Sequence, residues 1–154
     1  MSQNQTDALP PGVVEVVETL TGTYTQDVHT GRHILTADEP TDVGGDDRGP
    51  GPYEYLLAGL GACTSMTVRM YAKRKGIKLD RISVRLSHKK VHAEDCADCD
   101  TKPVDIDLIE RNISFEGDLD NETRAKLLEI ANKCPVHRTL TGKIEVRTQL
   151  IGGR

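Results

Sequence analysis

The 154-residue sequence has no tryptophan and one phenylalanine, and aromatic residues make up only 3% of it. Any core must therefore be built from aliphatic side chains. The hydrophobic fraction of 36% leaves a single chain short of buried surface, which favours an oligomer. The sequence also lacks an apolar run long enough to span a membrane and an N-terminal signal pattern. We therefore expect a cytoplasmic protein that does not associate with a membrane.

Positive charge is not in excess either. The chain has 20 Lys and Arg residues against 24 Asp and Glu residues, a formal net charge of −4. Non-specific binding to nucleic acid depends on Lys and Arg that neutralise phosphates, so the charge argues against this class of function. The dense basic run at residues 69–75 falls at the predicted end of a helix, where cations complement the helix dipole. We interpret it as a solvated helix end.

The order of predicted elements indicates an α+β protein without internal repeats. Residues 1–11 are polar and end in two prolines, so we expect a disordered lead-in followed by a single domain over residues 12–154. Short segments rich in β-branched residues predict antiparallel strands. These strands are expected over residues 13–18, 19–28, 32–36, 79–86, 104–115 and 144–150. The alternation of apolar residues slips between Ile106 and Ile113, which predicts a β-bulge.

Two longer segments have helical periodicity. In residues 53–75, apolar or small side chains recur at steps of three and four and trace one helical face. In residues 118–133, Asp120 is the expected N-cap of a second amphipathic helix. The predicted stripe of the first helix comprises Leu56, Leu60, Cys63, Thr67 and Met70, and that of the second comprises Leu127, Ile130, Ala131 and Cys134.

Cys63 and Cys134 therefore lie on the inward faces of two predicted helices. Helices packed on one sheet can bring two Cα atoms within the roughly 4.4–6.8 Å that a disulfide needs. The pair could equally be small core residues, because free cysteine is among the most buried residue types, and spacing alone favours this interpretation. Cys134, however, precedes Pro135 at a predicted helix break, where N–H groups stabilise a thiolate. His137 and Arg138 follow at once and could add positive charge.

Two motifs carry a more specific signal. Residues 49–64 read GPGPYEYLLAGLGACT, residues 133–140 read KCPVHRTL, and an Asp-Glu-Pro sequence stands at residues 38–40. Together they resemble the OsmC/Ohr family of osmotically inducible and organic hydroperoxide resistance proteins, over about residues 13–150. The resemblance implies an OsmC-like α+β fold, with a curved, antiparallel-rich sheet packed on two long helices. It also implies an intertwined homodimer with active sites at the subunit interface.

The same resemblance implies a two-cysteine peroxidase, in which Cys63 matches the peroxidatic cysteine and Cys134 the resolving one. A Cys63 thiolate would reduce an organic hydroperoxide, or hydrogen peroxide as a further substrate, and become a sulfenic acid. Cys134 would condense with it to a disulfide. A dithiol, for which the resemblance suggests a lipoylated protein, would then restore both thiols. This chemistry requires no metal or other cofactor.

The residues that would activate Cys63 depart from the family pattern. Members of the family place a glutamate directly after the proline that begins the cysteine helix, with a partner arginine from an N-terminal strand. Here the carboxylate, Glu54, comes one residue later. Arg32 is the candidate arginine, and Arg48 is its rival. If neither reaches Cys63, turnover would be slow, because an ordinary cysteine is mostly protonated at neutral pH.

Two other functions fit parts of the sequence. His88, His92, Cys96 and Cys99 offer the nitrogen and sulfur ligands that zinc prefers, although their order is the reverse of a zinc finger. A lone Cys-x-x-Cys is weak evidence for such a binding module, so we interpret this pair as two exposed thiols.

The other alternative is a cysteine hydrolase, in which His137 activates Cys63 or Cys134. No oxyanion-hole signal stands out in the sequence to support it. Residues that could either line a substrate pocket at the dimer interface or belong to the core are Leu56, Leu60, Met66 and Met70.

Overall fold

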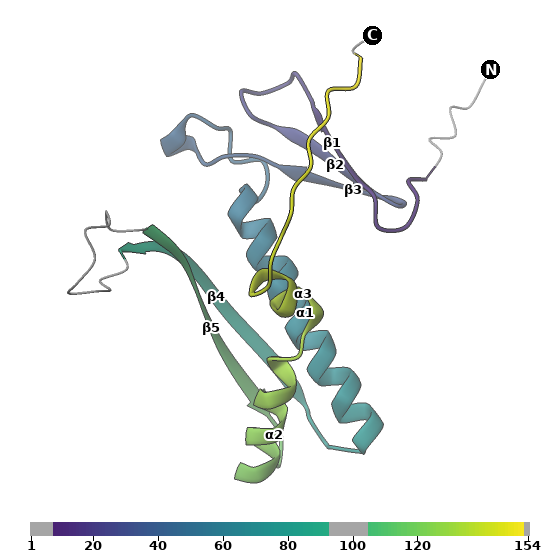
Figure 1. Cartoon of the computed structure of the whole chain (residues 1–154), viewed down its shortest axis with the longest axis vertical. Coiled ribbons are helices and arrows are strands. Elements are labelled where there is room, and N and C mark those ends of the chain that lie inside the picture. Colours follow the sequence, from purple (N-terminus) through teal and green to yellow (C-terminus); the bar gives the residue numbers. More distant parts are fainter. Residues whose placement is uncertain (1–7, 93–104, 153–154) are drawn as a thin grey trace. The chain divides into compact units, whose positions relative to one another are not determined.

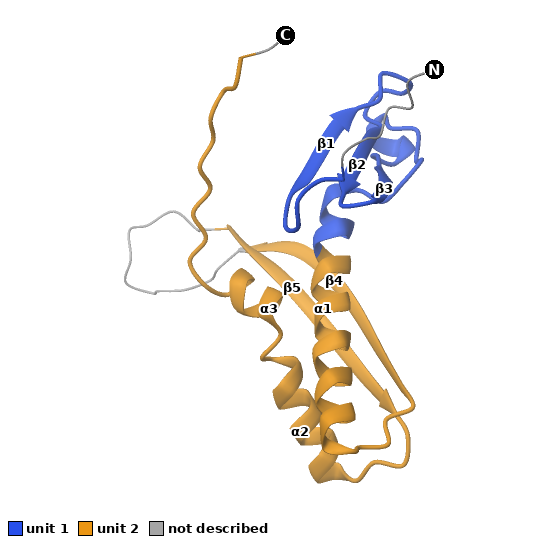
Figure 2. Ribbon diagram, turned by 90° about the vertical axis from the view of Figure 1, so that its right-hand side faces the viewer, with its two compact units in different colours: residues 1–56 blue, residues 57–154 orange. Residues whose placement is uncertain are grey.

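The computed structural model describes residues 8–92 and 105–152 (Figure 1). The chain divides into two compact units, residues 1–56 and 57–154 (Figure 2, blue and orange). The long helix α1 (Pro52–Lys75) begins in the first unit and continues through the second. Among the described residues, no helix is long and apolar enough to cross a membrane. The single domain over residues 12–154 stays a prediction.

The first unit contains a three-stranded antiparallel sheet in the order β1 (Val14–Glu18), β2 (Gln26–Thr30) and β3 (His33–Ala37). The predicted N-terminal strands are thus confirmed, but the second begins seven residues later than expected. Residues between β1 and β2 form a loop in which Leu20 has a φ of 60°. The turn between β2 and β3 contains Gly31 at a φ of 55°, a left-handed conformation that glycine adopts at little cost.

Asp38 organises the loop that leads from β3 into α1. Its carboxylate is buried and accepts hydrogen bonds from Thr25 Oγ1 at 3.0 Å and from the backbone N–H groups of Glu39 at 2.8 Å and Arg48 at 3.3 Å. Burial raises the pKa of Asp38, but these donors outweigh it and lower the pKa below its ordinary value. The phenolic O–H of Tyr55 in the first turn of α1 donates to the Thr36 carbonyl at 2.6 Å.

The second unit is built on a hairpin of β4 (Arg81–His92) and β5 (Asp105–Glu116). Its register is continuous from the Arg81–Glu116 pair to the His92–Asp105 pair, so the predicted bulge is wrong. Half-buried and exposed side chains alternate over most of both strands. The alternating half-buried positions include Ile82, Val84, Leu86 and His88 on β4 and Ile109, Arg111, Ile113 and Phe115 on β5. The apolar alternation changes face between Leu108 and Ile109, which are both half-buried, and a charged residue, Arg111, occupies the inward position opposite Leu86.

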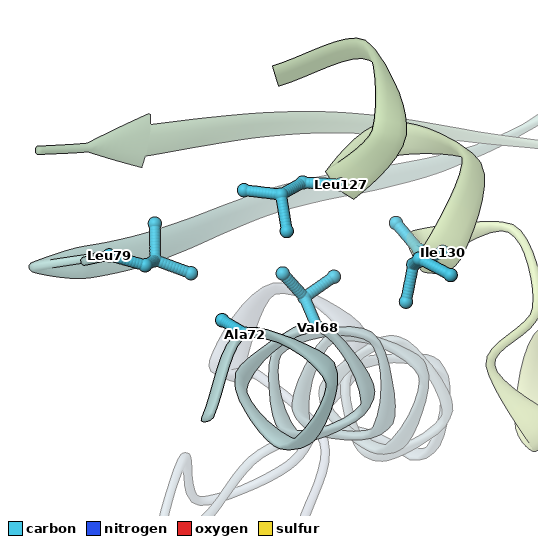
Figure 3. Packing of buried hydrophobic residues seen from close by; sticks show 6 residues of the cluster. Val68, Ala72, Leu79, Leu127 and Ile130 are labelled. Atoms are coloured by element: carbon cyan, nitrogen blue, oxygen red, sulfur yellow. The ribbon is translucent and has the colours of Figure 1, made fainter. Parts of the chain in front are cut away.

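Helices α1 and α2 (Asn121–Ala131) bury their apolar faces against this hairpin. Figure 3 shows side chains of the two helices meeting in the core. The buried cluster consists of Val68, Ala72, Leu79, Leu127, Ile130 and Ala131, with Ile82, Ile113 and Phe115 of the strands packed against it. Asp120 caps α2 as predicted, since its carboxylate accepts from the Thr123 N–H at 2.7 Å.

The buried face of α1 differs from the predicted stripe. It comprises Leu60, Gly61, Thr64, Val68 and Ala72, whereas Met66 and Met70 are 64% and 65% exposed. Two apolar series run along this helix with nearly the same period, and periodicity does not say which one meets the sheet. A Cβ atom on Gly61 would lie 2.8 Å from Leu86 Cδ1, so α1 approaches β4 closely at this glycine.

The predicted last strand, residues 144–150, is wrong for the single chain. After α3 (Pro135–Leu140), residues 143–152 carry no regular secondary structure. The apolar side chains that alternate along this segment are exposed, from 54% for Ile144 to 100% for Leu150. A strand needs a neighbouring strand to accept and donate its backbone hydrogen bonds. The alternating pattern predicts a strand but does not supply that neighbour.

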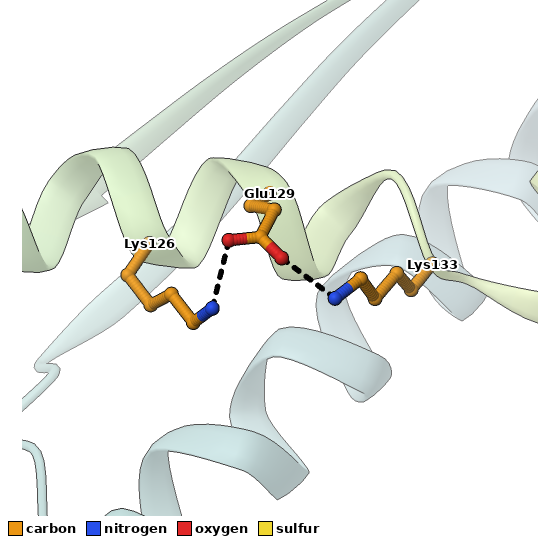
Figure 4. Close-up of polar contacts among 3 residues, drawn as sticks. All are labelled: Lys126, Glu129 and Lys133. Carbon is orange, nitrogen blue, oxygen red and sulfur yellow. Dashed lines mark hydrogen bonds and ion pairs between the residues drawn. The ribbon is translucent and has the colours of Figure 1, made fainter.

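An ion-pair ladder lines the exposed side of α2 (Figure 4). Glu129 binds Lys126 at 2.7 Å and Lys133 at 2.6 Å. Hydrogen bonds from Lys126 and then Lys133 lower the pKa of Glu129 from its ordinary 4.5 to about 2. The carboxylate therefore stays charged far into the acid range.

We expect Glu129→Gln to reduce the acid sensitivity of the fold. Because the folded-state pKa lies below the unfolded one, the ion pairs stabilise the fold above pH 4.5, and this contribution disappears as the pH falls towards 2. Urea unfolding of both proteins at low salt, from neutral pH down to pH 2, should give a difference in unfolding free energy that shrinks towards acid pH. A pH-independent difference would show that the ladder contributes nothing through charge.

Candidate two-cysteine site

The structure brings Cys63 and Cys134 together in the second unit. Cys63 lies in the middle of α1 and is partly buried, whereas Cys134 precedes α3 and has no exposed surface. Both are free thiols, and each affects the ionisation of the other, so their side chains lie near each other. Two neighbouring thiols on different elements of one packed unit are positioned for thiol–disulfide chemistry.

Cys134 is held by the local structure around Pro135. The proline occupies the first turn of α3, where its missing N–H is not needed, and Cys134 is the N-cap residue. The Cys134 sulfur accepts a hydrogen bond from the His137 backbone N–H at 3.4 Å. The Val136 backbone N–H also favours the thiolate at either cysteine. The helix break that was predicted from Pro135 therefore provides donors at the sulfur pair.

These surroundings favour ionisation of Cys134 over that of Cys63. Burial raises its pKa, but hydrogen bonds from the Cys63 thiol, the His137 N–H and Thr64 outweigh burial, and the pKa of Cys134 falls below its ordinary value. For Cys63, burial and then the contact with Cys134 raise the pKa. Within one chain, Cys134 is therefore the more readily ionised of the two thiols.

His137 and Arg138 contribute to the site through their backbone N–H groups. Burial, and then the charge of Arg111, lower the pKa of the His137 imidazole, so the ring is neutral at neutral pH. His137 thus adds no positive charge to the site. Arg138 is exposed and donates its backbone N–H to the Cys134 carbonyl at 3.1 Å.

Sequence analysis did not single out Arg111. Its side chain contacts the segment that carries Cys63 and the segment that leads to Cys134. Its Nη1 donates to Thr64 Oγ1 at 2.8 Å and to the Ala131 carbonyl at 3.4 Å, and its Nη2 donates to Asn132 Oδ1 at 2.8 Å. Thr64 is the neighbour of Cys63, and Asn132 comes two residues before Cys134. The available signal was a charged residue at a position that shares one strand face with Ile109, Ile113 and Phe115.

The other predicted supporting residues lie in the first unit, whereas both cysteines lie in the second. Glu54 accepts the Gly51 backbone N–H at 2.8 Å, which caps α1 about two and a half turns before Cys63. Arg48 donates its Nη1 to Thr21 Oγ1 at 3.3 Å. Arg32 is exposed in the turn between β2 and β3.

In the second unit, residues of α1, β5 and α3 line a cavity of about 390 Å³. Polar groups of Arg111 and His137 face it together with apolar side chains, among them Leu60 and Leu140. Of the four apolar residues expected to line a pocket or the core, Leu60 therefore lines this cavity. The other three, Leu56, Met66 and Met70, are exposed on α1.

The model of the OsmC-like protein family matches residues 44–149. This chain belongs to the OsmC-like family. The predicted OsmC-like α+β fold, with antiparallel sheets and helices, is therefore confirmed. No curated protein gives a significant match.

Solved structures share the fold at low sequence identity. An organic hydroperoxide resistance protein OsmC from Legionella pneumophila is 19% identical, with a TM-score of 0.61 over 88% of this chain and 92% of that one. An OsmC-like protein from Mycoplasma pneumoniae is 19% identical, with a TM-score of 0.63 over 84% and 86%. The organic hydroperoxide resistance protein OhrB of Bacillus subtilis is 20% identical, with a TM-score of 0.56 over 88% and 95%.

The two alternative functions of this OsmC-like chain stay predictions. Cys96, Cys99 and the side chain of His92 lie outside the described residues, and His88 Nε2 is bonded to Asp107 Oδ1 at 2.8 Å. Within residues 8–92 and 105–152, no group of three or more His, Cys, Asp and Glu side chains could hold a metal ion. For the hydrolase, the hydrogen bond from His137 to Cys134 comes from the backbone N–H, not from the catalytic imidazole that was proposed.

We expect Cys134 to ionise at lower pH than Cys63. Variants that combine Cys96→Ser and Cys99→Ser with either Cys63→Ser or Cys134→Ser each retain one thiol, and the new serine keeps a hydroxyl donor beside it. Titration of the ultraviolet thiolate absorbance gives both pKa values, with a variant lacking all four cysteines as the tyrosine background. The opposite order would contradict the readier ionisation of Cys134.

Proposed function

We propose that this OsmC-like protein reduces organic hydroperoxides, with Cys63 as the reacting thiol and Cys134 as the resolving one. The observation that carries the proposal is the neighbouring pair of free cysteines in a packed unit. The relatives from Legionella pneumophila and Bacillus subtilis, described as organic hydroperoxide resistance proteins, support the choice of substrate. Hydrogen peroxide is the second proposed substrate.

The reaction begins with a proton transfer between the two thiols. Transfer of the Cys63 proton to the neighbouring Cys134 thiolate gives a Cys63 thiolate, which attacks the outer oxygen of the hydroperoxide. The O–O bond breaks, an alcohol leaves with the available proton, and Cys63 becomes a sulfenic acid. Cys63 is the more accessible of the two, since Cys134 has no exposed surface.

Resolution uses the readier ionisation of Cys134. The Cys134 thiolate attacks the Cys63 sulfenic acid, the S–O bond breaks, and hydroxide leaves and takes up a proton as water. The Cys63–Cys134 disulfide is then reduced in two exchange steps by a dithiol, for which we propose a lipoylated protein. The cycle uses no metal or other cofactor, and we place it in the cytoplasm, where thiols are kept reduced.

A peroxidase assay with cumene hydroperoxide and a dithiol tests this cycle. We expect wild type to turn over repeatedly, Cys63→Ser to be inactive, and Cys134→Ser to consume about one equivalent before Cys63 is overoxidised, as mass spectrometry would show. The matched control carries Cys96→Ser and Cys99→Ser and should keep wild-type activity. Equal activity of wild type, Cys63→Ser and Cys134→Ser would rule out the mechanism.

We also propose that the chain works as an intertwined homodimer with the site at the subunit interface. The support is apolar surface that a single chain leaves exposed, on the C-terminal segment and on α1. On the segment it includes Val146 at 83% and Leu150 at 100%, and on α1 it includes Met66 and Met70. In a dimer the segment would pair as a strand with a second copy, and Arg32, with Arg48 as its rival, is the proposed cation for Cys63.

Replacing the apolar side of the C-terminal segment should weaken the dimer. We expect Val146→Ser with Leu150→Ser to shift the sedimentation equilibrium from dimer towards monomer, because both side chains would lose buried surface. Glu145→Ser with Arg147→Ser alters the opposite side of the same segment and should leave the dimer intact. A wild-type protein that sediments as a monomer would contradict the proposal.

A further inference from the structure

Arg111 is a half-buried charged side chain on the inward face of β5, between the apolar residues Ile109 and Ile113. Burying a charge is costly unless polar partners compensate. Among the described residues, the hydrogen-bond partners of its guanidinium are uncharged and lie on two other elements: Thr64 on α1, and the Ala131 carbonyl and Asn132 side chain at the end of α2. Arg111 therefore joins three elements at a position where an apolar residue would pack at less cost.

The C-terminal end of α2 receives from Arg111 a cation that its own last turn lacks. The last carbonyl groups of a helix have no partners within the helix and carry partial negative charge. No basic residue lies in the last turn of α2. Arg111 Nη1 donates to the Ala131 carbonyl at 3.4 Å, and its Nη2 donates to Asn132 Oδ1 at 2.8 Å. These bonds hold the end of the helix against β5.

The Ala131 carbonyl also connects Arg111 to the backbone of Cys134. It accepts the Cys134 backbone N–H at 3.3 Å as well as Arg111 Nη1. A carbonyl oxygen has two lone pairs, so it can accept both hydrogen bonds. A single oxygen atom thus separates the guanidinium from the backbone N–H of Cys134.

On its other side, Arg111 holds the residue that follows Cys63 in the chain. Its Nη1 donates to Thr64 Oγ1 at 2.8 Å, and the Thr64 hydroxyl donates to the Leu60 carbonyl at 2.7 Å. The bond to Leu60 uses the hydroxyl proton and leaves the lone pairs of the oxygen for Arg111. Thr64 and Ala131 have no exposed surface, and one nitrogen atom binds both. The segments that carry Cys63 and Cys134 cannot move apart here without breaking one of these bonds.

We propose that Arg111 is a positioning residue that holds the segments of Cys63 and Cys134 together, so that the two thiols readily form a disulfide. We call Arg111 and its bonds to Thr64, Ala131 and Asn132 the Arg111 clamp. A guanidinium suits this role because its N–H groups form a rigid, planar fork. The part of the clamp in resolving a sulfenic acid rests on the proposed peroxidase function. The clamp itself does not, since it concerns only how readily two thiols pair.

Arg124 offers a matched control on the same two elements. It lies in the first half of α2, and its guanidinium donates at 2.7, 3.3 and 3.2 Å to three backbone carbonyls, those of Phe115 in β5, Gly117 and Leu119. Arg124 therefore joins β5 to α2 through three hydrogen bonds, as many as Arg111 makes. Its bonds lie at the start of α2, whereas the chain continues to Cys134 from the other end.

Equilibration in glutathione buffers measures how readily the two thiols pair. The background protein carries Cys96→Ser and Cys99→Ser, so that within one chain only Cys63 and Cys134 can form a disulfide. The two thiols pass two electrons and two protons to oxidised glutathione, which becomes two molecules of reduced glutathione as the protein gains one S–S bond. Alkylation and mass spectrometry then give the ratio of disulfide to dithiol.

We expect Arg111→Gln to lower this ratio by at least about tenfold. Without the clamp, the released segment must be ordered again before the sulfurs can bond, and fixing the backbone of one residue has an effect of this size. Arg124→Gln should leave the ratio near that of the background protein, although urea unfolding should show that both variants are destabilised. A merely structural role would lower stability in both variants and change the ratio in neither.

Three results would overturn the proposal. They are an unchanged ratio in a folded Arg111→Gln variant, an equal fall of the ratio in Arg124→Gln, and a background protein that forms no Cys63–Cys134 disulfide in oxidising buffer. If circular dichroism shows that Arg111→Gln does not fold, Thr64→Val and Asn132→Ala each remove one side-chain acceptor of the clamp. An unchanged ratio in both of these variants would also overturn it.

The sign of the change separates placement from charge. Loss of a nearby cation makes a thiolate less stable, which disfavours the reduced form and raises the ratio of disulfide to dithiol. The clamp predicts that Arg111→Gln lowers the ratio. A higher ratio would therefore show that Arg111 acts through its charge and would contradict a positioning role.

The peroxide assay distinguishes failure of the clamp from failure of the proposed function. With all cysteines present, Arg111→Gln should slow disulfide formation and raise the fraction of Cys63 that is overoxidised per turnover, whereas Arg124→Gln should not. A wild type that is inactive towards peroxide, with a disulfide ratio that falls in Arg111→Gln, would refute the peroxidase function and leave the clamp standing. An active wild type whose ratio ignores Arg111→Gln would refute only the clamp.

Discussion

The proximity of Cys63 and Cys134 is the constraint on which the proposed chemistry of this protein depends. It requires three elements to be held together: the middle of α1, the end of α2 and the start of α3. Packing of α1 and α2 on the β4–β5 hairpin provides most of this, and the bare backbone of Gly61 lets α1 approach Leu86 closely. Pro135 then begins α3 immediately after Cys134, so that backbone donors face its sulfur.

Polar groups around this pair decide which thiol ionises more readily. Donors gather at Cys134, which is fully buried, while the pKa of the more accessible Cys63 is raised. This division suits a cycle in which one thiol meets the peroxide and the other is ready to resolve the product. Arg111 stabilises the arrangement by joining β5 to Thr64 of α1 and to the C-terminal end of α2.

The sequence could predict features that depend on local chemistry. Asp120 as a helix cap, the break at Pro135 and the strands before α1 all follow from side chains acting on their own backbone. Sequence analysis failed where one pattern of apolar residues was compatible with two tertiary arrangements. The apolar residues of α1 allowed two stripes, and the structure buries the one containing Val68 and Ala72 and exposes Met66 and Met70. The slip of apolar alternation between Ile106 and Ile113 was interpreted as a bulge, although the register is continuous.

The sequence by itself determined the family and the two motifs that carry the cysteines, because these are written in contiguous residues. Only the tertiary structure decided that Cys134 ionises more readily than Cys63 and that Arg111 contacts Thr64 and Asn132, near the two cysteines in the chain. The physical reason is that a thiol's ionisation depends on donors that arrive from other elements, and β5 lies far from both motifs along the chain. The alternating residues 144–150 illustrate the same limit, since a strand exists only where another strand accepts its hydrogen bonds.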